Sequence, residues 1–172
     1  MKVLIVVDMQ NDFIDGSLGT KEAIKIVKKV KEKIETYIKE GNAVIFTRDT
    51  HYDDYLTTRE GFNLPIKHCI KDTNGWQISS EFDTSDCIVF DKNTFGSIEL
   101  MEYVSNHFPD ADFELIGLCT DICVITNALL IKAGLPEANI SVDASCCAGV
   151  TVESHNNALN AMKMCQINII GE

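Results

Sequence analysis

The chain has 172 residues, of which 45% are hydrophobic and 24% are charged, and its formal net charge is -11. These proportions are typical of a globular domain and exclude a disordered chain. The acidic balance argues against a nucleic-acid partner, because phosphate binding needs clustered Lys and Arg. No apolar run approaches the roughly 20 residues that cross a bilayer, which argues against a membrane partner. The 7 cysteines lack a regular framework and indicate a reducing compartment. We therefore expect one cytoplasmic domain over residues 1–172.

Short apolar runs alternate with helical patterns along the chain. In chain order the predicted elements are a strand over 3–7, a helix over 21–39, strands over 43–47 and 87–90, a helix from about 97, a strand over 113–116, a helix over 121–133, a strand over 140–142, a helix over 152–164 and a strand over 167–170. The stretch 48–85 has no clear periodicity, and such long loops are usually functional. The alternation predicts a Rossmann-like three-layer α/β/α fold with a mostly parallel six-stranded sheet.

Reactive side chains follow four of these predicted strands. In an open parallel sheet, ligands bind beyond the carboxyl ends of the strands, where the strand order reverses. Asp8 follows the first strand, Asp49 and His51 follow the second, Lys92 follows the third and Cys123 follows the fourth. We therefore expect these side chains to meet at one rim of the sheet.

Cys123 lies in the first turn of a predicted helix, where the helix dipole and a neighbouring cation lower the pKa of a thiol. A buried structural cysteine explains this position equally well, since cysteine is among the most buried residue types. Taken alone, Asp8 could cap a turn and Lys92 could be a surface lysine. Taken together, the three side chains suit a thiol nucleophile with a base and a stabilising cation.

Asp49, His51 and His68 form a second group of candidate functional residues. One carboxylate and two imidazoles suit Zn²⁺, Fe²⁺ or Mn²⁺, with positions left open for water and substrate. The spacing does not by itself imply that His68 meets the other two. No G-x-G-x-x-G or Walker motif occurs, so we expect no nucleotide cofactor.

Two segments resemble the signature segments of the isochorismatase-like cysteine hydrolases, the superfamily that includes nicotinamidase. They are VVDMQNDF over 6–13 and GLCTDICV over 117–124. Further matching positions follow in the expected order, at 47–51, 68–69, 92, 95–97 and 143–144. The resemblance therefore spans nearly the whole chain.

The resemblance implies a catalytic triad of Asp8, Lys92 and Cys123. It also implies an oxyanion hole made by the backbone amides of Cys119 and Cys123, and a cis peptide bond between Leu118 and Cys119. The implied reaction is hydrolysis of a small-molecule amide through a thioester on the cysteine, in a homo-oligomer of two or four subunits.

The resemblance further implies a substrate pocket with Phe13 and Leu118 in its walls. It implies a divalent metal at Asp49, His51 and His68, with zinc expected and iron or manganese as alternatives. The walls depart from the nicotinamidase pattern. Residues 52–57 contain no further histidine, and 64–67 contain no aromatic residue to pack on a pyridine ring.

Three other functions fit parts of the sequence. One is metal-independent, isochorismatase-type hydrolysis of a small acid or ether. Another is a redox-active thiol protein that uses Cys119 and Cys123, although this gives Asp8 and Lys92 no purpose. The last is a doubly wound domain that only binds a ligand or partner.

Overall fold

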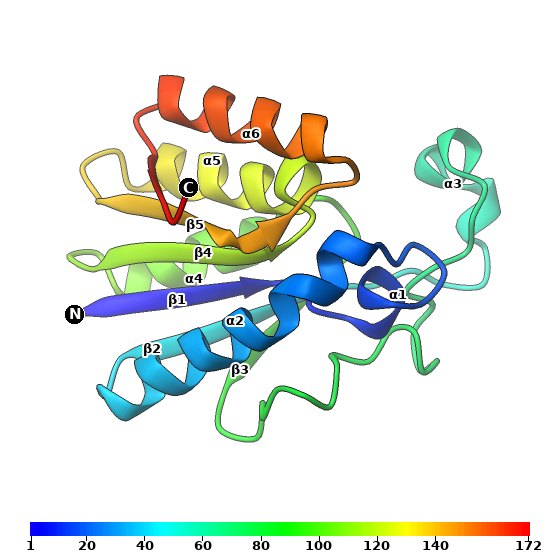
Figure 1. Cartoon of the computed structure of the whole chain (residues 1–172), viewed down its shortest axis with the longest axis horizontal. Helices are drawn as coiled ribbons and strands as arrows, with labels where there is room; N and C mark the ends of the chain where they lie inside the picture. Colours follow the sequence, from blue (N-terminus) through cyan, green and yellow to red (C-terminus); the bar gives the residue numbers. More distant parts are fainter.

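Six strands form one parallel sheet in the computed structural model, which describes residues 1–172 (Figure 1). The strand order is β3-β2-β1-β4-β5-β6, and every neighbouring pair is parallel. The strands are β1 (Lys2–Val7), β2 (Ala43–Asp49), β3 (Ile88–Lys92), β4 (Asp112–Leu118), β5 (Ile140–Ala148) and β6 (Asn168–Ile170). The predicted fold is confirmed, and the sheet is wholly rather than mostly parallel.

Helices cover both faces of this sheet. The helices of the chain are α1 (Asn11–Ile14), α2 (Lys21–Lys39), α3 (Arg59–Asn63), α4 (Ile98–His107), α5 (Ile125–Gly134) and α6 (Val152–Met164), with a 3-10 turn η1 (Tyr55–Thr57) and a π-helical turn η2 (Thr120–Val124). One apolar cluster packs α4, α5 and α6 against the sheet, and a second packs α1 and α2 against the other face. These are the outer layers of the three-layer fold.

The central strand β1 shows how the sequence divides between the two layers. Its residues from Val3 to Val7 are fully buried. Alternate side chains of a strand point to opposite faces, so Val3, Ile5 and Val7 enter the α4–α6 cluster while Leu4 and Val6 enter the α2 cluster. A parallel strand buried on both faces needs this continuous apolar run.

Helix α2 begins and ends where the sequence predicts. The Thr20 side chain caps its first turn by accepting the N–H of Ala23 at 3.0 Å, and Gly41 follows its end with a φ of 72°. Its apolar side chains recur at helical spacing and its lysines face outward. No helix in the protein is both long and apolar enough to cross a membrane.

Four predictions about the elements need correction. β5 continues to Ala148 instead of ending at 142, because its later residues stay buried beside β4. The predicted helix over 121–133 is divided into η2 and α5. The stretch 48–85 contains η1 and α3, which are too short to show periodicity. Asp49 and Lys92 are the last residues of their strands and do not lie beyond them.

A charged network joins α2 to the sheet. The Lys33 ammonium lies 2.7 Å from Oε1 of Glu114 and 2.8 Å from Oδ2 of Asp143. The Tyr37 hydroxyl donates to Oε2 of Glu114 at 2.7 Å, and the Ser145 hydroxyl donates to Oδ1 of Asp143 at 2.8 Å. Burial alone would raise the pKa of Asp143, but the bonds from Lys33 and Ser145 outweigh burial and lower it.

This network predicts an acid-sensitive contribution to stability. The pKa of Asp143 is lower in the folded state than in the unfolded state. The ionised carboxylate therefore stabilises the fold above about pH 4, and this stabilisation is lost as the pH falls through the pKa of Asp143 in the folded protein. Asp143→Asn should reduce the free energy of unfolding at pH 7 by about 1 kcal/mol. The free energy of unfolding of this variant should also fall less between pH 7 and pH 3 than that of wild type. Urea titrations at both pH values measure this. Asp110→Asn, at an exposed position, is the control, and an unchanged acid decline in Asp143→Asn would contradict the assignment.

Candidate active site

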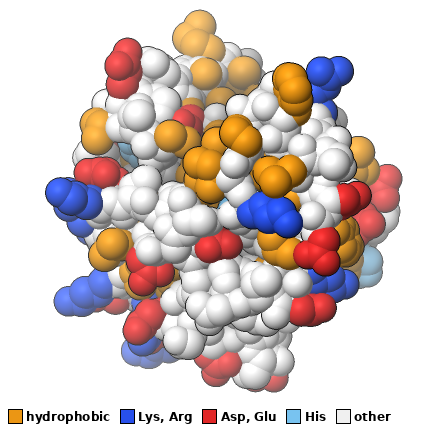
Figure 2. All heavy atoms as spheres, turned by 90° about the vertical axis from the view of Figure 1, so that its right-hand side faces the viewer, with side chains coloured by type: hydrophobic (Ala, Val, Ile, Leu, Met, Phe, Trp, Pro, Cys, Tyr) orange, Lys and Arg blue, Asp and Glu red, His pale blue; other side chains and the backbone are white.

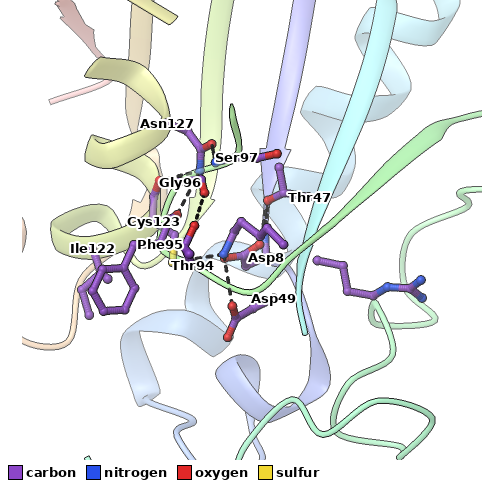
Figure 3. A network of polar contacts seen from close by, with 12 residues as sticks. Asp8, Thr47, Asp49, Thr94, Phe95, Gly96, Ser97, Ile122, Cys123 and Asn127 are labelled. Carbon is purple, nitrogen blue, oxygen red and sulfur yellow. Dashed lines mark hydrogen bonds and ion pairs between the residues drawn. The ribbon is translucent and has the colours of Figure 1, made fainter. Parts of the chain in front are cut away.

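The carboxyl ends of β1 and β4 lie side by side where the strand order reverses. β2 and β3 extend from β1 in one direction, and β5 and β6 extend from β4 in the other. Asp8 follows β1 directly and Cys123 lies in η2 just after β4, while Asp49 and Lys92 end β2 and β3. Figure 3 shows Asp8, Asp49 and Cys123 from these separate elements around one centre. The predicted meeting of the strand ends therefore occurs.

The Lys92 ammonium is the central group of this cluster. Its Nζ lies 2.7 Å from Oδ2 of Asp8, 3.3 Å from Oδ1 of Asp49 and 3.6 Å from Sγ of Cys123. All four residues are buried, with exposed fractions of 5% or less. Burying an unpaired charge costs much free energy. The Lys92 ammonium avoids this cost because two carboxylates and a sulfur surround it.

Burial and charge set the protonation of these groups. Burial raises the pKa of Asp8, although the Lys92 ammonium opposes the rise. Burial would also raise the pKa of Asp49, but the interactions with Lys92 and His51 outweigh burial and lower it. Burial would lower the pKa of Lys92, yet the carboxylates of Asp8 and Asp49 raise it well above its ordinary value, so the side chain stays an ammonium.

The expected lowering of the pKa of Cys123 is wrong. Burial raises the pKa of this thiol well above its ordinary value, and the charges of Asp8 and Asp49 add to the rise while Lys92 opposes it. The sequence places a cation near the sulfur but does not reveal how completely the sulfur is buried. The resting group is therefore a thiol, and its use as a nucleophile requires a base.

A sharp turn presents Cys123 at the end of β4. Gly117 has a φ of 117°, and a side chain there would collide with the backbone of Val7. The peptide bond between Leu118 and Cys119 is cis, as the resemblance implies. The carbonyl of Cys119 then accepts the N–H of Val124 at 3.1 Å, which closes the π-helical turn around Cys123.

Asn127 fixes this turn to a neighbouring loop. Its side-chain amide donates to the carbonyl of Cys123 at 2.8 Å and to the carbonyl of Phe95 at 3.3 Å, and it accepts the N–H of Ser97 at 2.9 Å. Asn127 is 1% exposed, and Figure 3 shows it between the two segments. Sequence reasoning missed this residue, because an asparagine within a helix carries no signal of a partner 30 residues away.

Asp49, His51 and His68 form the second predicted group, and the structure brings them together. One ligand atom from each lies within 4.8 Å of the others, and all three residues are buried. Nε2 of His51 lies 2.9 Å from Oδ2 of Asp49 but makes no hydrogen bond of good geometry. The carbonyl of Ile66 lies 2.8 Å from Nδ1 of His68. When Nδ1 carries the proton, Nε2 of His68 offers a lone pair to the same space.

These residues fit a divalent metal ion. A carboxylate and two imidazoles with an unpartnered buried nitrogen are a donor set that cations such as Zn²⁺ accept. Glu60 adds a second carboxylate, since its Oε1 lies 3.6 Å from Nε2 of both His51 and His68. Sequence reasoning missed Glu60, because it belongs to the irregular stretch 48–85 and reaches the group only through the fold of α3.

A pocket of about 880 Å³ opens beside both groups. Phe13, Ile122 and Phe95 line it together with Cys123 and the candidate metal-binding residues. Figure 2 shows this end of the molecule, where hydrophobic side chains gather among charged ones. The prediction for Phe13 agrees with its position in the wall. A separate cavity of about 210 Å³, between α2 and the start of α6, contains none of these groups.

Leu118 does not line the pocket, which corrects its predicted place in the wall. It is 1% exposed and belongs to the apolar cluster between the sheet and α2. The reason is strand geometry, because Leu118 lies two residues after Ile116 in β4 and therefore points to the same face of the sheet, which packs against α2. Cys119, the next residue, is among those that line the pocket.

The fold and the cluster define a doubly wound α/β protein with a thiol, a carboxylate and an ammonium at the switch point of its sheet. The family model described as Isochorismatase domain matches residues 2–171. The chain therefore belongs to the isochorismatase family, as the resemblance indicates.

Individual relatives agree with this assignment. The chain is 25% identical to the nicotinamidase/pyrazinamidase of Mycobacterium tuberculosis, over 99% of this chain and 98% of that one. It is 25% identical to the nicotinamidase of Saccharomyces cerevisiae, over 75% of this chain and 80% of the relative. The crystal structure of the pyrazinamidase of Pyrococcus horikoshii in complex with zinc superposes with a TM-score of 0.86 at 26% identity, and 99% of each chain is covered.

The central position of Lys92 predicts a large effect on stability. Lys92→Met should lower the free energy of unfolding of the metal-free protein by about 3 kcal/mol, because it leaves two carboxylates buried without their cation. Urea denaturation measures the change. Adding Asp8→Asn should recover part of the loss, since one of the two unpaired charges is then removed. Lys21→Met, at an exposed position, is the control. Equal stability of Lys92→Met and wild type would show that the ion pairs are not maintained.

Proposed function

We propose that this protein hydrolyses a small-molecule amide with Cys123 as the nucleophile. The predicted class, an amide-cleaving hydrolase, is confirmed by the family and by curated relatives that are nicotinamidases. The single observation that carries the proposed mechanism is the position of the Lys92 ammonium, 3.6 Å from Sγ of Cys123 and 2.7 Å from Oδ2 of Asp8. A nucleophile, a base and a stabilising cation are thus adjacent, and the nucleophile lines the pocket.

Acylation begins when Asp8 removes the proton from Cys123. The sulfur attacks the amide carbonyl, and the oxygen becomes an oxyanion that accepts the backbone N–H groups of Cys119 and Cys123. One such donor contributes about 3 kcal/mol to a transition state. Asp8 then gives its proton to the nitrogen, the C–N bond breaks, and ammonia leaves a thioester on Cys123.

Hydrolysis of the thioester uses the same base. Asp8 takes a proton from water, the resulting hydroxide equivalent attacks the thioester carbonyl, and the C–S bond breaks. The acid product leaves, and the proton held by Asp8 returns to the sulfur. Lys92 keeps its proton throughout, because neighbouring negative groups hold its pKa well above its ordinary value. Its charge stabilises the thiolate and the carboxylate in turn.

Asp49, His51 and His68 are proposed to hold a divalent metal, with Glu60 as a fourth ligand. Zinc is the proposed ion, supported by the zinc in the related pyrazinamidase, and iron or manganese would suit the same donors. A cation at this place supplies Lewis-acid chemistry beside the pocket. Oδ1 of Asp49 also lies 3.3 Å from the Lys92 ammonium, so the residues of the two groups are in direct contact.

The pocket supports an uncharged aromatic or apolar amide as substrate. Phe13 forms one wall, and its ring centroid lies 5.6 Å from that of His68. Nicotinamide and pyrazinamide are the first candidates, because the relatives are named for them. The pocket volume of about 880 Å³ also admits amides larger than one ring. The cytoplasmic location, the single domain and the assembly of two or four subunits stay predictions.

The proposed nucleophile predicts a specific loss of activity. Cys123→Ala should reduce ammonia release from a panel of one-ring and larger amides by at least about 1,000-fold, because no other group can form the thioester. Cys165→Ala is the control, since Cys165 is an exposed cysteine at the end of α6. Ammonia release that persists in Cys123→Ala would contradict the mechanism. Turnover of a small acid or ether with no amide turnover would instead favour the isochorismatase-type reaction.

The proposed metal site predicts a graded loss of affinity. Calorimetric titration of the metal-free protein with Zn²⁺ should show one site, and His68→Ala should weaken it by about 100-fold because a ligand is removed. Glu60→Gln should weaken it by about 10-fold, since a neutral amide replaces a carboxylate. Asp53→Asn is the control, because this exposed carboxylate lies outside the group. Equal affinity in wild type and His68→Ala would refute the site.

A further inference from the structure

Thr47 contacts Asp8 from the neighbouring strand and is fully buried. Its hydroxyl donates to Oδ1 of Asp8 at 2.6 Å, and its Oγ1 accepts the backbone N–H of Asp8 at 3.2 Å. The same N–H also lies 3.3 Å from the Thr47 carbonyl oxygen. Figure 3 shows the two side chains joined in this way. Thr47 therefore contacts both the backbone and the carboxylate of Asp8.

The backbone of Asp8 needs such support. Its φ is 47°, in the left-handed region that residues with a side chain rarely adopt. This conformation turns Asp8 away from the course of β1 at the point where the sheet ends. The bonds from its N–H to Thr47 satisfy a buried donor that the strand ladder no longer pairs regularly.

The single proton of the Thr47 hydroxyl distinguishes the two carboxylate oxygens of Asp8. A hydroxyl has one hydrogen to donate, and here it is directed to Oδ1. The other oxygen, Oδ2, is buried and paired with the Lys92 ammonium at 2.7 Å. The Thr47 hydroxyl and the Lys92 ammonium therefore hold one oxygen each and together fix the orientation of the carboxyl.

We propose that Thr47 is a positioning residue, which holds the Asp8 carboxyl in the orientation that takes the proton of Cys123 and returns it to the leaving nitrogen. The inference rests on the proposed function, because it gives Thr47 a part in each proton transfer. The proton balance is that of the mechanism above. Thr47 itself exchanges no proton and acts only through Asp8.

A purely structural role would have different consequences. If the Thr47 hydroxyl only satisfied a buried carboxylate, its loss would lower stability and leave the turnover of the folded protein unchanged. If it orients the base, its loss lowers kcat while KM stays nearly constant, because substrate binding involves other residues. The reactivity of the Cys123 thiol would fall as well, and this can be read without any substrate.

The test compares Thr47→Val, which has the same shape without the hydroxyl, with Thr47→Ser, which keeps the hydroxyl. In Thr47→Val, kcat for ammonia release should fall by about 30-fold with KM changed less than about 2-fold. The rate at which iodoacetamide labels Cys123, followed by mass spectrometry against the other cysteines, should fall by about 10-fold. Thr47→Ser should restore both rates to within about 3-fold of wild type. Thr47→Ala, which adds no methyl group against Asp8, should reproduce the loss if Thr47→Val folds poorly.

Wild-type rates of turnover and labelling in folded Thr47→Val or Thr47→Ala would overturn the inference. Equal impairment of Thr47→Ser and Thr47→Val would also overturn it, since packing rather than the hydroxyl would then be responsible. Failure of the proposed function gives a different result. Wild-type protein would release no ammonia from any amide, while the labelling of Cys123 would still report whether Thr47 acts on Asp8.

Discussion

The buried ammonium of Lys92 is the interaction on which the site depends. Asp8 and Asp49 approach it from two other strands, and neither carboxylate could stay ionised at this depth without it. Their attraction in turn keeps Lys92 protonated. The Cys123 sulfur completes the shell at 3.6 Å, where a thiolate would be stabilised as it forms. The Lys92 ammonium thus stabilises the ends of the strands and would also stabilise a thiolate at Cys123.

Asp49 connects the thiol centre to the metal-binding group. Its Oδ1 faces Lys92, while its Oδ2 lies 2.9 Å from Nε2 of His51. Gln10 holds its backbone in place, because the Gln10 side chain accepts the N–H of Asp49 at 2.7 Å and donates to its carbonyl at 2.8 Å. The Gln10 amide also donates to the carbonyl of Trp76 at 2.8 Å. One buried amide therefore ties the end of β2 to the long irregular stretch.

That irregular stretch supplies much of the pocket wall and the second histidine. His68 and Glu60 approach Asp49 and His51 from segments that have no regular pairing with the sheet. The Asp12 carboxylate accepts the N–H of Cys69 at 2.7 Å and so holds the chain next to His68. The proposed function therefore assigns selectivity among amides to these segments, while Asp8, Lys92 and Cys123 are held at the strand ends.

The sequence by itself determined the architecture and the position of the reactive groups. The apolar runs and the helical patterns predict the strand–helix alternation, and parallel strands must end at one edge, so Asp8, Lys92 and Cys123 could be placed together without coordinates. Only the tertiary structure decided how β5 continues to Ala148 and why Leu118 belongs to the core. It also decided the protonation of Cys123 and the contacts of Glu60, Thr47 and Asn127. These depend on the depth of burial and on partners distant in the chain, which local periodicity and residue spacing do not encode.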